Sequence, residues 1–315
     1  MPSVRPRRPS GKVWAAKVGI GRRQPGKNQL HELESFTSAS MQEWAAYGQA
    51  NRDYQYALFF DLESQRAARQ NDLCAALRGS SACRVDLDGW FRLVNFKYSL
   101  SPLSPAGSLR WVGGRFNYGQ EIDADRFTPF PALYVAEDFL TAFREYHSLA
   151  PTDVTSGLSP QELSLEDSGS WATLRLRGHV SNVFDLTRSR SIAEFCKVIS
   201  KFTLSNRVRE AERRANRSAT TLVRAPRELM ASLSDRDWKY LPVHFDIPSN
   251  SQVFGKLLIE SGFEGVLYRS AKSRRKCLAI FTRQLVGSDS VISLHEDRPS
   301  EIEFCEINAS NCLQV

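Results

Sequence analysis

Residues 111–147 read WVGGRFNYGQEIDADRFTPFPALYVAEDFLTAFREYH and form the most informative stretch of the chain. Two glycines directly precede Arg115, and glycine lets a backbone approach another group closely. Leu133–Ala136 contains an aromatic and a β-branched residue, which favours a strand. Because side chains alternate across a strand, Tyr134 is expected on the face opposite to its two neighbours. The stretch therefore predicts a glycine turn followed by a short strand.

A helix that carries Glu145 is predicted directly after this strand. Glu137 and Asp138 suit the start of a helix, where carboxylates accept hydrogen bonds from backbone amides. The apolar face of this helix would consist of Phe139, Ala142, Phe143 and Tyr146. At about 100° per residue, Glu145 falls on the border of that face. We expect its carboxylate to point along the edge of the core into a cleft and to converge with Tyr134.

Predicted helices and strands both occur in the rest of the chain, and we expect an α+β fold. A strand is predicted at Trp90–Val94, a polar loop at 149–169, and one or two strands at 171–186. The charge alternation of Ser205–Ser218 predicts a solvated helix. Another helix is expected to run from Pro226 to about Leu233.

The last third contains a helix, a strand, a loop and a second strand. The helix begins near Ser249 and stops at Gly262. The strands are expected at Gly265–Ser270 and Cys277–Phe281. The basic loop between them, Lys272–Lys276, fits either a charged hairpin tip or a rim that attracts anions, and both interpretations predict exposure.

Composition divides the chain into a basic leader, a helical region, a main domain and a tail. The proline-free, alanine- and leucine-rich part of residues 32–89 predicts helices, the main domain is expected at 90–298, and residues 299–315 are expected to be a C-terminal tail. The formal net charge is +7, and residues 1–31 alone contribute +8, so the remainder carries −1. Composition favours a disordered leader. An arm that contacts nucleic acid or an acidic partner, and an organelle transit peptide, are alternatives.

Several classes of protein and site are excluded by the sequence. The six cysteines form no Cys-x-x-Cys pair and no metal-binding spacing with the histidines, so neither a metal site nor a disulfide framework is expected and a reducing cytoplasm fits best. No apolar run reaches the roughly 18 residues of a membrane helix. The Gly-x-Ser-x-Gly, Walker and His-Glu-x-x-His motifs are absent, which removes support for hydrolase triads, P-loop chemistry and zinc catalysis.

The remaining polar residues suit cleavage of a glycosidic bond in a nucleotide. Cleavage between nicotinamide and ribose develops positive charge on the sugar, and the carboxylate of Glu145 would stabilise it. Arginine supplies a planar fork of donors for pyrophosphate, with Arg115 as the candidate and Arg92 as the second choice. An aromatic ring would stack on the nicotinamide or the ribose, with Tyr134 as the candidate and Tyr118 as the alternative.

The order of these motifs resembles the RES domain, a family named for its arginine, glutamate and serine. The resemblance spans roughly residues 90–285 and rests on these segments: Phe91-Arg92, Gly113–Asn117, Leu133–Ala136, Ala142–Glu145 and Gly265–Ser270. It implies an ADP-ribosyltransferase-like mixed β core with flanking helices. It assigns Glu145, Arg115 and Ser270 to catalysis, and Arg115, Tyr134 and Asn117 to the binding of NAD as a substrate, with no prosthetic group.

The same resemblance implies a toxin that consumes NAD and is neutralised by a helix-turn-helix antitoxin. Water, phosphate or a macromolecule could accept the ADP-ribose. An alternative function is that of a non-catalytic protein that binds nucleic acid or a partner through the basic leader. A third is that of a transferase acting on the end of an RNA or a protein.

Overall fold

The computed structural model describes residues 38–149, 170–295 and 298–315. The predicted basic leader at residues 1–31, and nearly all of the predicted loop at 149–169, lie outside these ranges. The chain divides into two compact units. The first comprises the chain up to Ala57 together with Ser205–Thr221, and the second comprises Leu58–Leu204 and Leu222–Val315. This division differs from the predicted boundary at residue 89, because a segment distant in sequence packs with the start of the first helix.

The first unit contains the start of α1 (Ser38–Ala68) and α6 (Asn206–Arg214). Arg217 connects the two, since its Nη1 donates to Asn51 Oδ1 (2.7 Å) and its guanidinium carbon lies 4.8 Å from the ring centre of Tyr54. On α6, Val208, Ala211 and Glu212 are buried. The predicted solvated helix is therefore solvated on one side only.

The second unit is built on an eight-stranded sheet. Its strands are β1 (Ala82–Asp86), β2 (Phe91–Asn95), β3 (Leu133–Ala136), β4 (Trp171–Asp185), β5 (Gly265–Arg269), β6 (Lys276–Ile280), β7 (Val291–Leu294) and β8 (Glu306–Ile307). They follow the order β2-β3-β6-β5-β4-β7-β8, and β4 also pairs with β1 and β2. Among the described strands, β4 and β5 pair in parallel and the other pairs are antiparallel. The protein is thus α+β with a mixed sheet, as predicted.

The long strand β4 closes part of this sheet on itself. It has 15 residues, pairs with β2 near its start, and pairs with β5 near its end. The strands β2, β3, β6, β5 and β4 consequently form a continuous ring of pairings. The single strand of 171–185 resolves the choice between one and two strands that the sequence left open.

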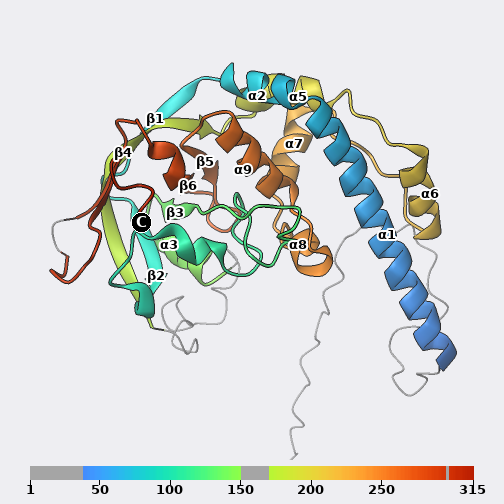
Figure 1. Cartoon of the computed structure of the whole chain (residues 1–315), viewed down its shortest axis with the longest axis horizontal. Coiled ribbons are helices and arrows are strands. Elements are labelled where there is room, and N and C mark those ends of the chain that lie inside the picture. The colour runs from blue at the N-terminus through green and yellow to red at the C-terminus, as the bar shows by residue number, and fades with distance from the viewer. Residues whose placement is uncertain (1–37, 150–169, 296–297) are drawn as a thin grey trace, which may run out of the picture. The chain divides into compact units, whose positions relative to one another are not determined.

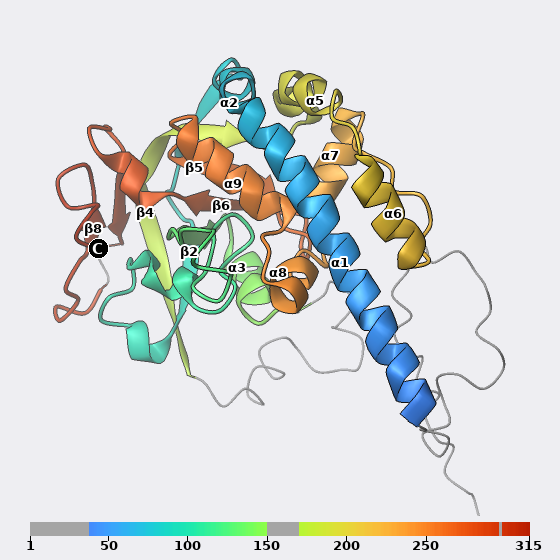
Figure 2. The same ribbon diagram turned by 45° about the vertical axis from the view of Figure 1, so that its right-hand side comes forward.

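Both faces of the central strands are buried in separate apolar cores. Leu133 and Val135 belong to one core, whereas Ala136 belongs to the other and Tyr134 packs against it, as strand alternation predicts. On the Tyr134 face, α3 (Phe139–Tyr146) packs on β2 and β3, and α9 (Asn250–Glu260) packs on β5 (Figures 1 and 2). Loops and the C-terminal segment supply the opposite core.

Four further α-helices of the second unit lie outside the sheet. They are α2 (Gln70–Arg78), α5 (Ala193–Ile199), α7 (Pro226–Leu233) and α8 (Tyr240–Phe245). The helix α2 contacts α5 and α9, and α7 contacts α5 and α9. The predicted helices at Pro226–Leu233 and after Ser249 are confirmed. In the described ranges, no helix combines the length and the apolar character needed to cross a lipid bilayer.

Two predicted boundaries are wrong. The region predicted as helical, 32–89, ends in a strand, because β1 pairs with β4. The predicted tail at 299–315 belongs to the domain, since β8 pairs with β7 and both Ile307 and Cys312 are buried in a core. Both segments are short and bury few residues on their own, so their structure depends on pairing with distant strands.

Candidate active site

The glycine turn at 113–117 requires glycine at two positions, for two different reasons. Gly113 has a φ of +87°, in the left-handed region that side chains disfavour. A Cβ atom on Gly114 would lie 2.4 Å from the phenolic oxygen of Tyr134. The first glycine therefore shapes the turn, and the second lets the turn lie directly against the tyrosine of β3.

Two residues of α9 hold this turn from the other side. Gln252 is fully buried, and its Nε2 donates to the carbonyls of Val112 (2.8 Å), Gly114 (3.1 Å) and Asn117 (2.9 Å). One turn further along α9, a Cβ on Gly255 would lie 2.1 Å from the carbonyl oxygen of Phe116. Neither residue was predicted to belong to the site, because each contacts a partner more than 130 positions away in the sequence.

Tyr134 is clamped by the turn. Its hydroxyl donates to Asn117 Oδ1 (2.9 Å) and accepts from the backbone amide of Phe116 (2.9 Å). Burial raises the pKa of Tyr134 well above its ordinary value. The phenol is therefore protonated at neutral pH and acts as neither a base nor a nucleophile. The face of its ring is the part that remains to be offered to a ligand.

Two predicted binding residues, Asn117 and Tyr118, lie in the core instead. The Asn117 side chain is fully buried, and its Nδ2 donates to the carbonyls of Ser108 (2.9 Å) and Phe130 (3.0 Å). Tyr118 is also buried, with its ring centre 4.9 Å from that of Phe130. Asn117 consequently positions the turn and Tyr134, and Tyr118 packs the core, so both side chains are enclosed by the protein.

Arg92, the second candidate for binding phosphate, is also a structural residue. Its Nε, Nη1 and Nη2 donate to the carbonyls of Pro102 (2.8 Å), Tyr134 (3.0 Å) and Ser104 (3.0 Å). Burial lowers the pKa of Arg92 to about 10, which still leaves it charged at neutral pH. The guanidinium thus joins β2, β3 and the loop after β2.

Arg115 is tethered by the end of α7 and the segment that follows it. Its Nη1 donates to the carbonyls of Leu233 (3.3 Å) and Asp235 (2.7 Å), and its guanidinium carbon lies 5.7 Å from the ring centre of Trp238. Within the described ranges, its hydrogen bonds all come from Nη1. The edge formed by Nε and Nη2, which makes bidentate contacts with carboxylates and phosphates, is available to a ligand.

The structure brings Glu145 together with Ser270, whereas the hydroxyl of Tyr134, with which Glu145 was expected to converge, bonds to the glycine turn. The Ser270 hydroxyl, which is 2% exposed, donates to Glu145 Oε1 and accepts from the backbone amides of Lys272 (3.0 Å) and Ser273 (3.1 Å). The amides orient the hydroxyl, and the hydroxyl orients the carboxylate. The end of β5 and the helix α3 are joined at this point.

The basic loop after Ser270 is exposed, as both interpretations predicted. Arg274, Arg275 and Lys276 are exposed. Arg275 pairs with Glu137 (3.1 Å) and Asp138 (3.3 Å), which fastens the loop to the start of α3. The loop thereby supports the Glu145 helix.

The ring of Tyr268 lies where the three predicted segments come together. Tyr268 pairs with Cys277 across the sheet, and its ring centre lies 4.9 Å from that of Phe116 in the glycine turn. Burial raises the pKa of Tyr268 well above its ordinary value; Cys277 and the charge of Glu145 raise it further, and Arg115 lowers it. The charges of Glu145 and Arg115 therefore both act at this ring.

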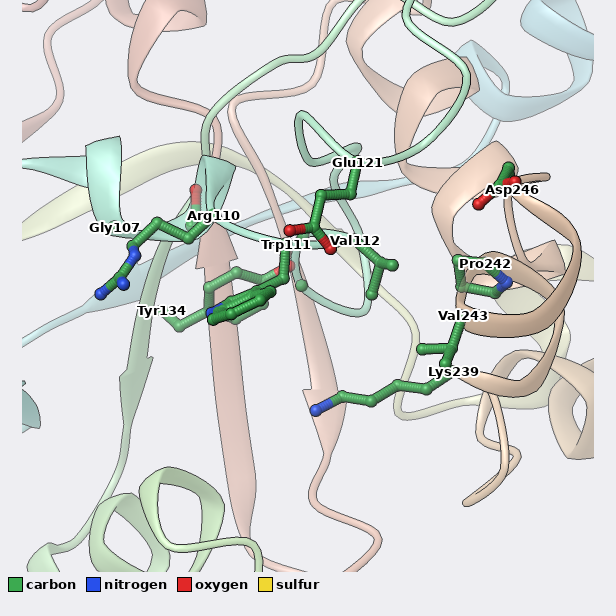
Figure 3. Close-up of a pocket in the computed structure, with 13 residues that line it drawn as sticks. Gly107, Arg110, Trp111, Val112, Glu121, Tyr134, Lys239, Pro242, Val243 and Asp246 are labelled. Atoms are coloured by element: carbon green, nitrogen blue, oxygen red, sulfur yellow. The ribbon is translucent and has the colours of Figure 1, made fainter.

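A cavity of about 510 Å³ opens on the outer side of the glycine turn. Tyr134 and the glycines form part of its wall, and its polar and aromatic lining includes Ser108, Arg110, Trp111, Glu121, Lys239 and Asp246 (Figure 3). Its volume is within the range of small-molecule sites. Neither Trp111 nor Lys239 was predicted as a site residue, although a tryptophan two positions before the glycine turn is a visible signal.

Comparisons with known proteins found similarity to solved structures only. No family model matches the chain, and no curated protein matches it. The chain is similar to a chain in the crystal structure of the M. tuberculosis MbcT-MbcA toxin-antitoxin complex, with 14% identity and a TM-score of 0.39. The similarity covers 77% of this chain and 96% of that chain. We therefore infer the chemistry of the site from the residues of this chain alone.

Proposed function

We propose that the chain is an NAD-consuming enzyme that cleaves the bond between nicotinamide and ribose. The observation that carries the proposal is that three segments meet at Tyr268. Ser270, two positions further along the chain, bonds to Glu145. Phe116, next to Arg115 in the glycine turn, contacts both the Tyr268 ring and the Tyr134 hydroxyl. Glu145, Ser270, Tyr134 and Arg115 come from a helix, two strands and a turn, and their chemistries suit the sugar, the base and the phosphates of a dinucleotide. The resemblance to the RES domain assigns the same residues to NAD.

Glu145 would stabilise the sugar as the bond breaks. Nicotinamide leaves C1′ of the ribose with the bonding electron pair and becomes neutral, which places positive charge on the sugar. The hydrogen bond from Ser270 holds the carboxylate in one orientation, so no reorganisation is needed when the charge develops. An acceptor oxygen then bonds to C1′, and its proton is released.

Arg115 and Tyr134 would hold the substrate for this step. The Nε and Nη2 edge of Arg115 suits the pyrophosphate, because a planar fork binds two oxygens at once. Its tether to the carbonyls of Leu233 and Asp235 reduces the entropy lost on binding. The clamped ring of Tyr134 gives the ribose or the nicotinamide a rigid surface.

The direct test is to incubate the purified full-length chain with NAD and to measure its loss. Glu145→Gln keeps an acceptor for Ser270 and removes the charge, so we expect activity to fall about 10²- to 10³-fold without a loss of thermal stability. Glu194→Gln, at an exposed glutamate of α5, is the matched control and should retain full activity. No loss of NAD with water, phosphate or candidate protein acceptors would contradict the proposal, and full activity of Glu145→Gln would contradict the role of this residue.

The products identify the acceptor, and a growth assay tests the cellular role. Water yields ADP-ribose, phosphate yields its phosphate ester, and a macromolecule becomes ADP-ribosylated. We propose further that the chain is the toxin of a toxin–antitoxin pair with a helix-turn-helix antitoxin. Expression of the chain should stop cell growth, expression of Glu145→Gln should not, and co-expression of the neighbouring reading frame should restore growth. Normal growth with the active chain would contradict the toxin role.

A further inference from the structure

The cavity beside the glycine turn has an exposed aromatic ring at its rim. Trp111 is 65% exposed and has a φ of +57°, a conformation that bulky residues rarely adopt. The surrounding loop imposes this conformation. The amide of Glu121 donates to the carbonyl of Trp111 (2.9 Å), and a Cβ on Gly119 would lie 2.2 Å from that carbonyl oxygen. The loop thus keeps the indole exposed at the cost of a strained backbone, and such strain is typical of functional positions.

Two charged side chains reach the same space from opposite sides. In Figure 3, the ammonium of Lys239 projects from the α8 side towards Trp111, and the carboxylate of Glu121 points into the region between them. Arg110 and Asp246 also line the cavity. In Figure 3 the guanidinium of Arg110 points away from this region, and Asp246 is drawn beyond Pro242, away from Trp111. An indole, a cation and a carboxylate around one cavity match the base, the phosphate and the ribose hydroxyls of a nucleotide.

The position of the cavity indicates which half of the substrate it would hold. Its lining includes Tyr134 but neither Glu145 nor Ser270, so it lies on the non-reacting side of the tyrosine. Lys239 directly follows Trp238, which contacts Arg115. Lys239 therefore belongs to the same short segment that binds the side chain of Arg115. A pyrophosphate between the two halves of NAD would require two cations placed in this way.

We propose that this cavity binds the adenosine monophosphate half of NAD, an inference that rests on the proposed function. Adenine stacks on the indole of Trp111, Lys239 pairs with the adjacent phosphate, and Glu121 accepts hydrogen bonds from the ribose hydroxyls. Tyr134 separates this half from the nicotinamide half at Glu145.

Calorimetry with AMP and with nicotinamide mononucleotide tests the assignment on the full-length chain. Removal of one base-stacking ring weakens binding by about 10- to 100-fold. Trp111→Gly should lower the affinity for AMP by this factor and leave the affinity for nicotinamide mononucleotide within about 3-fold. Glycine accepts a positive φ, so this variant should fold as well as the wild type. Trp111→Phe should retain part of the affinity, and Trp44→Ala, at an exposed tryptophan of α1, is the matched control and should retain all of it.

Two further variants separate the other contacts. Lys239→Met should weaken the binding of AMP but not that of adenosine, since only AMP carries the phosphate. Glu121→Gln should narrow the preference for AMP over an analogue phosphorylated on a ribose hydroxyl, because the carboxylate repels that phosphate. AMP should also inhibit NAD consumption competitively.

The outcomes distinguish this inference from the proposed function. If NAD is consumed but AMP does not bind, or binds Trp111→Gly as tightly as the wild type, the cavity assignment is wrong and the proposed function stands. If AMP binds through Trp111 but no acceptor supports NAD consumption, the chain is an adenine-nucleotide binder and the proposed function is wrong. If AMP does not bind and NAD is not consumed, both the cavity assignment and the proposed function are wrong.

Discussion

Replacement of Gly114 by alanine would test whether the glycine turn clamps Tyr134. The backbone of Gly114 does not have a positive φ, so alanine introduces no backbone strain there. The added Cβ would, however, lie 2.4 Å from the phenolic oxygen and 2.6 Å from Cζ of Tyr134. Either the ring or the turn must move, and the turn is held by the hydrogen bonds of the buried Gln252.

The free energy of unfolding should fall by about 2–4 kcal/mol. Displacement of the phenol removes its bonds to Phe116 N and Asn117 Oδ1, each worth about 0.5–1.5 kcal/mol. Overpacking adds about 1–3 kcal/mol. The smaller conformational entropy of unfolded alanine offsets about 0.4–1 kcal/mol of this loss.

Thermal unfolding of the full-length chain measures this effect. A change of 1 kcal/mol shifts the Tm of a domain of 150–250 residues by about 2–4 °C, so the expected decrease is roughly 5–15 °C. Gly107→Ala is the matched control, because Gly107 lines the same cavity and an added Cβ there has no atom within 4 Å. The control should stay within about 0.5 kcal/mol of the wild type. If Gly114→Ala were equally stable, the tyrosine would not be clamped, and the rigid stacking surface inferred for it would be refuted.

Two other substitutions test the supports of the site. Arg92→Lys cannot make the three hydrogen bonds of the guanidinium and should cost about 2–4 kcal/mol in thermal unfolding; an unchanged Tm would contradict a structural role. Asp138→Ala should cost about 0.5–2 kcal/mol at neutral pH, because Asp138 caps α3. Burial alone would raise the pKa of Asp138, but hydrogen bonds from Thr141 and Arg275 lower it below its ordinary 3.8. Its contribution is therefore complete above that value and lost as the pH falls through the lowered pKa, so a stability difference between wild type and variant that persisted in stronger acid would contradict this account.

Local patterns in the sequence were enough to predict the elements that carry the site. The alternation around Tyr134, the capped apolar helix before Glu145 and the strand that ends at Ser270 all depend on residues within a few positions of one another. Their physical causes are side-chain periodicity and the satisfaction of helix ends, which act over one or two turns. The contact between Glu145 and Ser270 joins positions 125 apart, and no local pattern predicts it.

The roles of individual polar residues followed from contacts between distant segments. Arg92, Asn117 and Tyr118 have the chemistry of ligand-binding residues, and only the burial of their side chains among backbone carbonyls or aromatic rings shows that they support the fold. Gln252 looks like an ordinary helix residue, yet it holds the glycine turn across the core. Burial and hydrogen-bond partners are set by how sheet, helices and loops pack together, and no short stretch of sequence contains that information.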